Sequence, residues 1–317
     1  MKAADTNAVA ERAGPNSAIE DDIGYGIAPK GFRLPARTRL GAVRLQIADL
    51  ERSIAYYEQV MGFRVVSRTA DSASLAAQGD DTVLIELNER AGARPVSRRG
   101  RLGLYHYAIL LPTRAALGRF VAHLAEIGMY AGMSDHLVSE AVYLSDPDGL
   151  GIEVYADRPR SEWKHEARQL TMATNPLNVQ DLIASAGGER WSGMPAGTVI
   201  GHVHLYVEDV GEAEKFYHDR LGFDKVVWSY PGALFLSAGG YHHHLGTNTW
   251  AVGAPPAEEN DARLLDWTIL VPDSEAAKAA ARSLEAGGYK VAGDRGSWIA
   301  TDPWGTKVRL TAADSLN

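Results

Sequence analysis

Two histidines lie two residues apart in the stretch Gly201–Val207, which reads GHVHLYV. Side chains of a β-strand alternate between its two faces, so His202, His204 and Tyr206 would share one face and the apolar residues between them the other. Neutral imidazole is a common ligand of transition metals. One buried, hydrogen-bonded histidine beside an exposed one would give the same pattern. The strand alone therefore leaves a metal site and a structural role open.

Composition limits the kind of metal site. The 317-residue chain contains no cysteine, which excludes disulfides, zinc–thiolate sites and iron–sulfur clusters. A net charge of −8 argues against nucleic acid as the main partner, because phosphate binding favours a basic surface. No apolar run approaches the roughly 20 residues that cross a bilayer. With no signal-peptide pattern at the N-terminus, we expect a cytoplasmic protein without membrane contact.

The elements that would position these residues recur at an offset of 160 residues. One unit begins at Gly41 and again at Gly201. It consists of a predicted strand, a helix that ends near a glycine, and further strands. A second unit begins at Leu104 and at Leu264, and its last two strands flank an Asp-Pro-x-Gly turn. In such a turn proline presets φ and glycine accepts positive φ. The pattern predicts four βαβββ-like modules, numbered 1 to 4 along the chain.

The modules also predict the domain organisation. The N-terminal segment is polar and has no clear period, so we expect a flexible arm that is ordered near Gly31–Pro35 by docking on the body. The expected divisions are the arm at 1–38, a first domain of modules 1 and 2 at 39–160, a linker with a short helix near Val179–Ser185 at 161–198, and a second domain of modules 3 and 4 at 199–317.

Two motifs connect these modules with a known superfamily. A strand that opens His-x-x-Leu-x-Val and a strand that ends Asp-Pro-x-Gly-x-x-x-Glu resemble the vicinal oxygen chelate superfamily, which includes glyoxalase I, antibiotic-resistance proteins and extradiol ring-cleaving dioxygenases. The segments GLYHYA at Gly103–Ala108 and GYHHHLG at Gly240–Gly246 most resemble catechol 2,3-dioxygenases. The resemblance covers about residues 40–312. It implies an α+β fold in which four modules pair into two cup-shaped sheets.

In this superfamily the first and last strands of two paired modules hold the metal. The resemblance assigns the first-strand position of modules 1 to 4 to Ala42, His106, His202 and Asp266, and the last-strand position to Glu86, Glu153, a residue near His244, and Arg309. Ala42 cannot bind a metal, and Arg309 would repel one. Pairing module 1 with 2 would give two carboxylates and one histidine, and pairing 3 with 4 would place Arg309 beside the cation.

Pairing module 2 with module 3 gives a more suitable set of ligands. It combines His106, Glu153 and His202, the two imidazoles and one carboxylate that non-haem Fe(II) oxygenases use. We therefore predict that modules 2 and 3 share a metal. Modules 1 and 4 would then form a second cup that is held by ion pairs and binds no metal.

The resemblance to extradiol dioxygenases implies further catalytic residues. In those enzymes a histidine of module 3 acts as acid and base, and His243 matches it best by its place in the middle of a histidine run. Tyr143 lies ten residues before Glu153, which is the spacing of the family's hydrogen-bonding tyrosine. His136 is a weaker match to a second histidine, because that histidine lies further from the tyrosine in the family.

The histidine run is expected to lie near the start of a strand at Tyr241–Trp250. Alternation along this strand would place His243 on the face opposite to its two neighbours, so one or two of the three would face the metal. A solvated loop with the same composition is the alternative. We expect His244, Asn248 and Trp250 to contact the substrate.

The implied function is an Fe(II)-dependent enzyme that inserts O2 into catechol or a substituted catechol to give a 2-hydroxymuconic semialdehyde, with Mn(II) as the alternative cation. Other metal-dependent reactions of the superfamily, such as hydroquinone cleavage or glyoxalase-like isomerisation, are a second hypothesis. A non-catalytic binding protein for small ligands is the third. His243 and Tyr143 favour ring cleavage, and three intact ligand positions disfavour a binding protein. Sheet edges leave a homo-oligomer open.

Overall fold

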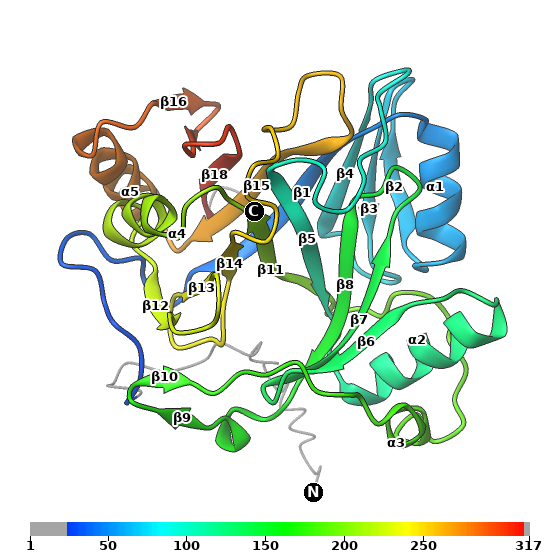
Figure 1. The fold of residues 1–317 in the computed structure, drawn as a ribbon. Coiled ribbons are helices and arrows are strands. Elements are labelled where there is room, and N and C mark those ends of the chain that lie inside the picture. Colours follow the sequence, from blue (N-terminus) through cyan, green and yellow to red (C-terminus); the bar gives the residue numbers. More distant parts are fainter. Residues whose placement is uncertain (1–23, 314–317) are drawn as a thin grey trace, which may run out of the picture.

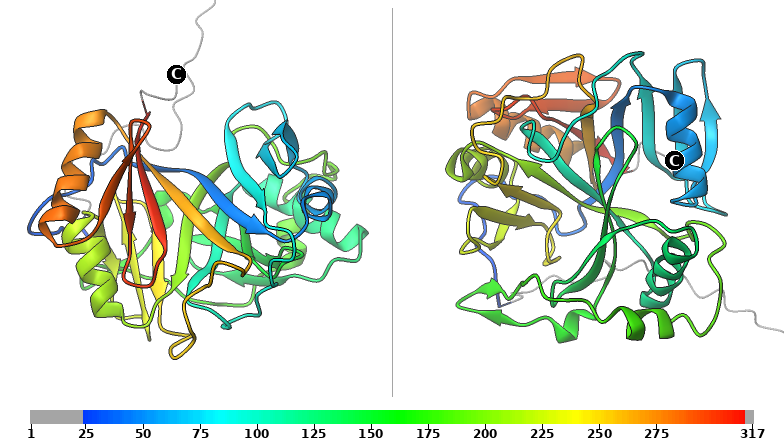
Figure 2. Two further views of the ribbon diagram at one scale, coloured as in Figure 1. Left: turned by 90° about the horizontal axis from the view of Figure 1, so that it is seen from above. Right: turned by 45° about the vertical axis from the view of Figure 1, so that its right-hand side comes forward.

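The computed structural model describes residues 24–313 (Figure 1). Two curled eight-stranded sheets form its centre. Figure 2 shows α4 (Val210–Ala213) and α5 (Ser274–Ala286) on one flank, and α1 (Leu50–Gln59) and α2 (Arg114–Glu126) on the opposite one. The predicted α+β fold of four modules in two sheets is confirmed. Within residues 24–313, no helix is both long and apolar enough to cross a membrane.

The first sheet joins module 2 to module 3. Its strands in spatial order are β12 (Asp224–Val227), β13 (Ala233–Ser237), β14 (Leu245–Asn248), β11 (Val199–Tyr206), β5 (Gly103–Leu110), β8 (Gly151–Asp157), β7 (Ser139–Ser145) and β6 (Gly132–Asp135). At its centre β5 and β11, from different halves of the chain, run antiparallel.

The second sheet joins module 4 to module 1 in the same way. Its strands are β16 (Val291–Asp294), β17 (Ser297–Thr301), β18 (Lys307–Ala312), β15 (Arg263–Val271), β1 (Arg39–Ile47), β4 (Val83–Glu89), β3 (Ser72–Ala76) and β2 (Arg64–Arg68). The strand order is therefore the predicted cross-pairing. Each sheet contains one module from each half of the chain. The expected domains at 39–160 and 199–317 therefore follow the order of the modules along the chain, but neither domain forms a sheet of its own.

Smaller elements connect modules 2 and 3. They are a 3₁₀ turn at Arg160–Glu162, the hairpin of β9 (His165–Glu166) and β10 (Gln169–Leu170), and α3 (Val179–Ala184). The helix α3 lies where the sequence predicts a short helix in the linker.

The end of the N-terminal arm docks on module 3, as predicted. The Leu34 side chain is buried, and its backbone N–H donates to the Gly222 carbonyl at 2.8 Å. The Arg33 guanidinium pairs with the Asp224 carboxylate at 2.7 Å. The arm's first part, 1–23, lies outside the described residues, and its expected flexibility stays a prediction.

Each module helix begins at a side chain that caps its first turn. Asp49, Thr113, Asp209 and Asp273 each accept a hydrogen bond from the backbone N–H three residues later. A cap of this kind is worth about 1 kcal/mol and fixes where the helix begins. In module 3 the helix continues as the π-helix Glu214–Arg220.

Two β-bulges interrupt the pairing of β5 with β11. Between the pairs Ile200–Ile109 and His202–Ala108, Gly201 is the extra residue. A Cβ on Gly201 would lie 1.8 Å from the Tyr155 hydroxyl oxygen, so a glycine here leaves room for the Tyr155 ring. The second bulge, at Tyr105, lies beside the pair His204–His106. A bulge redirects side chains, and Tyr105 and His106 accordingly line the same cavity although they are consecutive.

We predict that Gly201→Ala lowers the free energy of unfolding by about 1–3 kcal/mol, because the new methyl group overpacks the Tyr155 ring. Urea unfolding followed by circular dichroism measures this loss. In a Tyr155→Phe background the same substitution should cost less, since the clashing hydroxyl is gone. An equal loss in both backgrounds would contradict the proposed clash.

Candidate metal centre and its cavity

Three neighbouring strands of the first sheet bring the predicted metal ligands together. Ala108 on β5 pairs with Glu153 on β8 on one side and with His202 on β11 on the other. His106 lies two residues before Ala108. Its Nε2 atom is 3.0 Å from Oε2 of Glu153, and Nε2 of His202 is 3.1 Å from the same oxygen. One ligand atom from each of the three buried residues lies within 4.8 Å of the others.

The local hydrogen bonding fits a cation at this place. Neither ring nitrogen of His106 has a hydrogen-bond partner, and Nδ1 of His202 also lacks one. Nε2 of His106 is close to Glu153 but is not oriented for a hydrogen bond to it. Buried polar atoms are rarely left unpaired, because each costs about 1–3 kcal/mol. A metal ion bound by His106 through Nε2 would satisfy that nitrogen.

The protonation states also suit metal binding. Burial lowers the pKa of His106 and of His202, despite the nearby carboxylate. Burial alone would raise the pKa of Glu153, but the two imidazoles hold it well below its usual range. The site therefore presents two neutral imidazoles and one carboxylate at neutral pH. These are the forms that bind metal, and the set is that of non-haem Fe(II) oxygenases.

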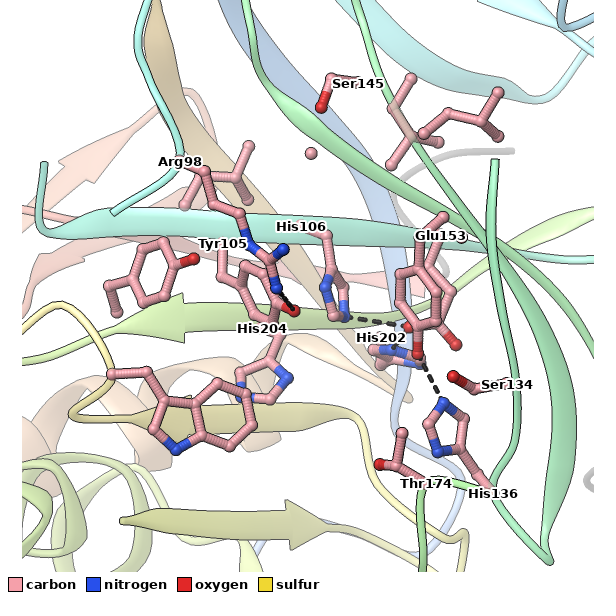
Figure 3. Close-up of a pocket in the computed structure, with 18 of the residues that line it drawn as sticks. Arg98, Tyr105, His106, Ser134, His136, Ser145, Glu153, Thr174, His202 and His204 are labelled. Atoms are coloured by element: carbon pink, nitrogen blue, oxygen red, sulfur yellow. Dashed lines mark hydrogen bonds and ion pairs between the residues drawn. The ribbon is translucent and has the colours of Figure 1, made fainter. Parts of the chain in front are cut away.

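A cavity of about 740 Å³ adjoins the three ligands (Figure 3). One side is aromatic, and its rings come from Tyr105, Tyr206, Tyr230, Phe235 and Trp250. The polar groups that line it include Tyr143, His136 and His243. A flat aromatic molecule with a few polar atoms suits such a lining.

Tyr143 and His136 form a hydrogen-bonded pair in this cavity. Nδ1 of His136 lies 2.6 Å from the Ala173 carbonyl oxygen and must donate to it, so Nε2 accepts from the Tyr143 hydroxyl, also at 2.6 Å. Burial, together with the charge of Glu153, raises the pKa of Tyr143 well above its ordinary value. Tyr143 therefore remains a protonated donor beside the metal ligands.

Of the three residues in the histidine run, only the middle one is among the described residues that line the cavity. The strand β14 begins only at Leu245, so the run lies in the irregular segment before it. His243 lines the cavity, and its ring centroid is 4.1 Å from that of His202. Burial lowers the pKa of His243 well below its ordinary value, which keeps the ring neutral. His244 instead stacks on Phe223 and accepts a hydrogen bond from the Ala238 backbone N–H at 3.2 Å.

The structure therefore places only one of the three predicted substrate contacts in the cavity. Trp250 lines the cavity, whereas His244 and Asn248 are not among the described residues that do. The Asn248 side-chain amide lies 2.9 Å from Nε2 of His204, and its oxygen accepts from the Trp250 backbone N–H. Asn248 thus orients His204, a cavity residue to which sequence reasoning assigned no role. The alternation along the strand could have indicated this role, because it places His204 on the same face as His202.

Sequence reasoning also missed Arg98 and Arg101, which line the cavity from the loop before β5. Arg98 approaches the Tyr105 hydroxyl at 3.5 Å, and Arg101 pairs with Asp261 at 2.6 Å. Neither belongs to a motif, so nothing in the sequence distinguished them from other surface arginines.

In the second sheet, ion pairs lie at the place that corresponds to the candidate metal ligands of the first sheet, as expected. The Arg44 guanidinium pairs with Glu86 at 2.9 Å and with Asp266 at 2.7 Å. Arg309 contacts the same Asp266 carboxylate at 3.3 Å. The positive side chains neutralise the carboxylates there, so this cup does not attract a cation.

Comparisons with known proteins concern the family and the fold of the chain. The family model described as Glyoxalase/Bleomycin resistance protein/Dioxygenase superfamily matches residues 39–154 and 199–310. A catechol-2,3-dioxygenase of Bacillus subtilis (strain 168) is 45% identical over 270 residues, which cover 84% of this chain and 94% of that protein.

One solved structure with a similar fold is a protein of Bacillus subtilis subsp. subtilis str. 168 that is provisionally described as a dioxygenase. Its TM-score is 0.62, and it is 14% identical over 89% of this chain and 86% of that one. Glyoxalase I from Zea mays has a TM-score of 0.53 and 18% identity over 88% and 94% of the two chains. At these identities the structures support the fold alone. On the strength of the family model and the 45% identical relative, the chain belongs to the glyoxalase/bleomycin resistance protein/dioxygenase superfamily.

Proposed function

We propose that this protein is an Fe(II)-dependent extradiol dioxygenase that opens the ring of catechol or a substituted catechol to a 2-hydroxymuconic semialdehyde. The observation that carries the proposal is the buried group of His106, Glu153 and His202 beside an aromatic cavity. The 45% identity to a catechol-2,3-dioxygenase over most of both chains supports it. Mn(II) suits the same three ligands, and we propose iron because this ligand set is typical of Fe(II) oxygenases.

Bound Fe(II) would supply open coordination positions at which a catechol and O2 can react, and it would favour the deprotonated catechol. The protein side chains supply the rest. His243 is neutral and can accept a proton from a substrate hydroxyl. Tyr143 stays protonated, and its hydroxyl can donate to a substrate oxygen once it gives up its hydrogen bond to Nε2 of His136. The surrounding aromatic rings can pack against the ring of the substrate and orient it.

His106→Ala should abolish both metal binding and ring cleavage, because it removes one of three ligands. The test is anaerobic reconstitution with Fe(II), iron analysis, and then addition of catechol and air, followed at the visible band of the yellow product. Wild type should bind about one iron per chain and give colour. His123→Ala is the matched control, since His123 lies on α2 and contacts the Val60 carbonyl.

Colour of equal strength in the His106→Ala variant would contradict the assigned metal site. Iron bound by the wild type without any colour would instead contradict catechol cleavage, and would favour another metal-dependent reaction of the superfamily.

Tyr143→Phe should lower kcat about 10- to 100-fold while iron content stays unchanged, because one hydrogen bond to a charged oxygen is worth about 1.5–3 kcal/mol. Steady-state kinetics and iron analysis measure the two effects. Tyr107→Phe is the matched control, since its hydroxyl bonds to that of Tyr57 in the core. A similar loss of kcat in both variants would mean that the effect is structural.

A further inference from the structure

Behind the cavity, His243 is linked to a carboxylate through a second histidine. Nδ1 of His243 lies 2.7 Å from Nδ1 of His242, and Nε2 of His242 lies 2.9 Å from Oδ1 of Asp157. His242 is completely buried and His243 nearly so. Asp157 is the last residue of β8, the strand that also carries Glu153. The carboxylate is therefore built into the same strand as a metal ligand.

If His242 is the neutral imidazole, the rules of hydrogen bonding set where the protons lie. An ionised carboxylate only accepts hydrogen bonds, so Nε2 of His242 must donate to Asp157. A neutral imidazole has one N–H, which makes Nδ1 of His242 an acceptor. The proton between the two Nδ1 atoms then belongs to His243. Nε2 of His243, a residue that lines the cavity, is left with a free lone pair.

We propose that Asp157 and His242 are positioning residues that hold His243 in the tautomer protonated at Nδ1, with Nε2 free to accept a proton from the substrate. The catalytic part rests on the proposed function. In the step concerned, a substrate O–H bond breaks, its electron pair stays on the substrate oxygen, and an N–H bond forms at Nε2 of His243.

The arrangement would also stabilise the product of that step. The positive charge that develops on His243 is met by the acceptor nitrogen of His242, and beyond it by the negative charge of Asp157. A carboxylate that orients a histidine in this way is a recurring device in enzymes, and its replacement by an amide is costly because the wrong tautomer forms.

Asp157 has a second contact that provides a control. The Tyr241 hydroxyl donates to the same Oδ1 atom at 3.2 Å and also contacts the Tyr155 hydroxyl at 2.6 Å. Tyr241→Phe removes a hydrogen bond to the carboxylate but leaves the link from Asp157 to His242. A purely structural role of Asp157 should respond to both substitutions, whereas control of the tautomer should respond only to the loss of the carboxylate.

The first test is the tautomer of His243 in the full-length, metal-free protein labelled with ¹⁵N-histidine. Long-range ¹H–¹⁵N spectra report which ring nitrogen carries the proton, and His243→Gln identifies the signal. We expect Nδ1–H in wild type and in Tyr241→Phe. In Asp157→Asn the Nε2–H form should appear, because an amide can donate as well as accept. His242→Phe, which removes the acceptor directly, should have the same effect.

The second test is the steady-state rate of the Fe(II)-loaded enzyme with catechol. Asp157→Asn should lower kcat about 10- to 100-fold with unchanged iron content, as is typical when the partner of a functional histidine is removed. Tyr241→Phe should remain close to wild type.

Nε2–H in wild type, or an unchanged His243 signal in both Asp157→Asn and His242→Phe, would overturn the proposal whatever the activity. A wild-type kcat in Asp157→Asn would overturn its catalytic part. The NMR result does not depend on ring cleavage. An enzyme that shows the expected tautomers but does not cleave catechol would therefore contradict the proposed function and not the assigned hydrogen bonds.

Discussion

The antiparallel pairing of β5 with β11 is the contact on which the site depends. It joins two modules that are far apart in the sequence and makes them neighbours in one sheet. The Glu153 and His202 side chains then lie on either side of Ala108, with His106 close by. No single module holds all three ligands. The site therefore exists only when the two halves of the chain fold together.

The second sheet has the same arrangement of strands but holds ion pairs in place of a candidate metal site. There β1 and β15 pair with equivalent bulges, and the strands carry Arg44, Asp266 and Arg309 where the first sheet has histidines and a glutamate. A guanidinium between carboxylates satisfies charges that would otherwise attract a cation. Side-chain chemistry, and not the fold, decides which of the two cups can bind a metal.

Around the candidate metal ligands, burial keeps ionisable groups in defined states. Desolvation makes the charged forms of buried histidine and tyrosine unfavourable. His243 consequently stays neutral and Tyr143 stays protonated. Hydrogen bonds then set the direction of each proton: the Ala173 carbonyl does so for His136, and the Asp157 carboxylate does so for the pair His242–His243. An acceptor and a donor are thereby held beside the same cavity.

From the sequence by itself, local periodicity and turn residues predicted the modules, and the resemblance to the superfamily together with side-chain chemistry predicted their pairing and the candidate metal ligands. Only the tertiary structure decided which neighbouring residues reach the cavity. The bulge at Tyr105 and the late start of β14 arise from pairing between distant strands, and local alternation does not predict them. For the same reason the partner of His242, 85 residues away, could not be read from the histidine run.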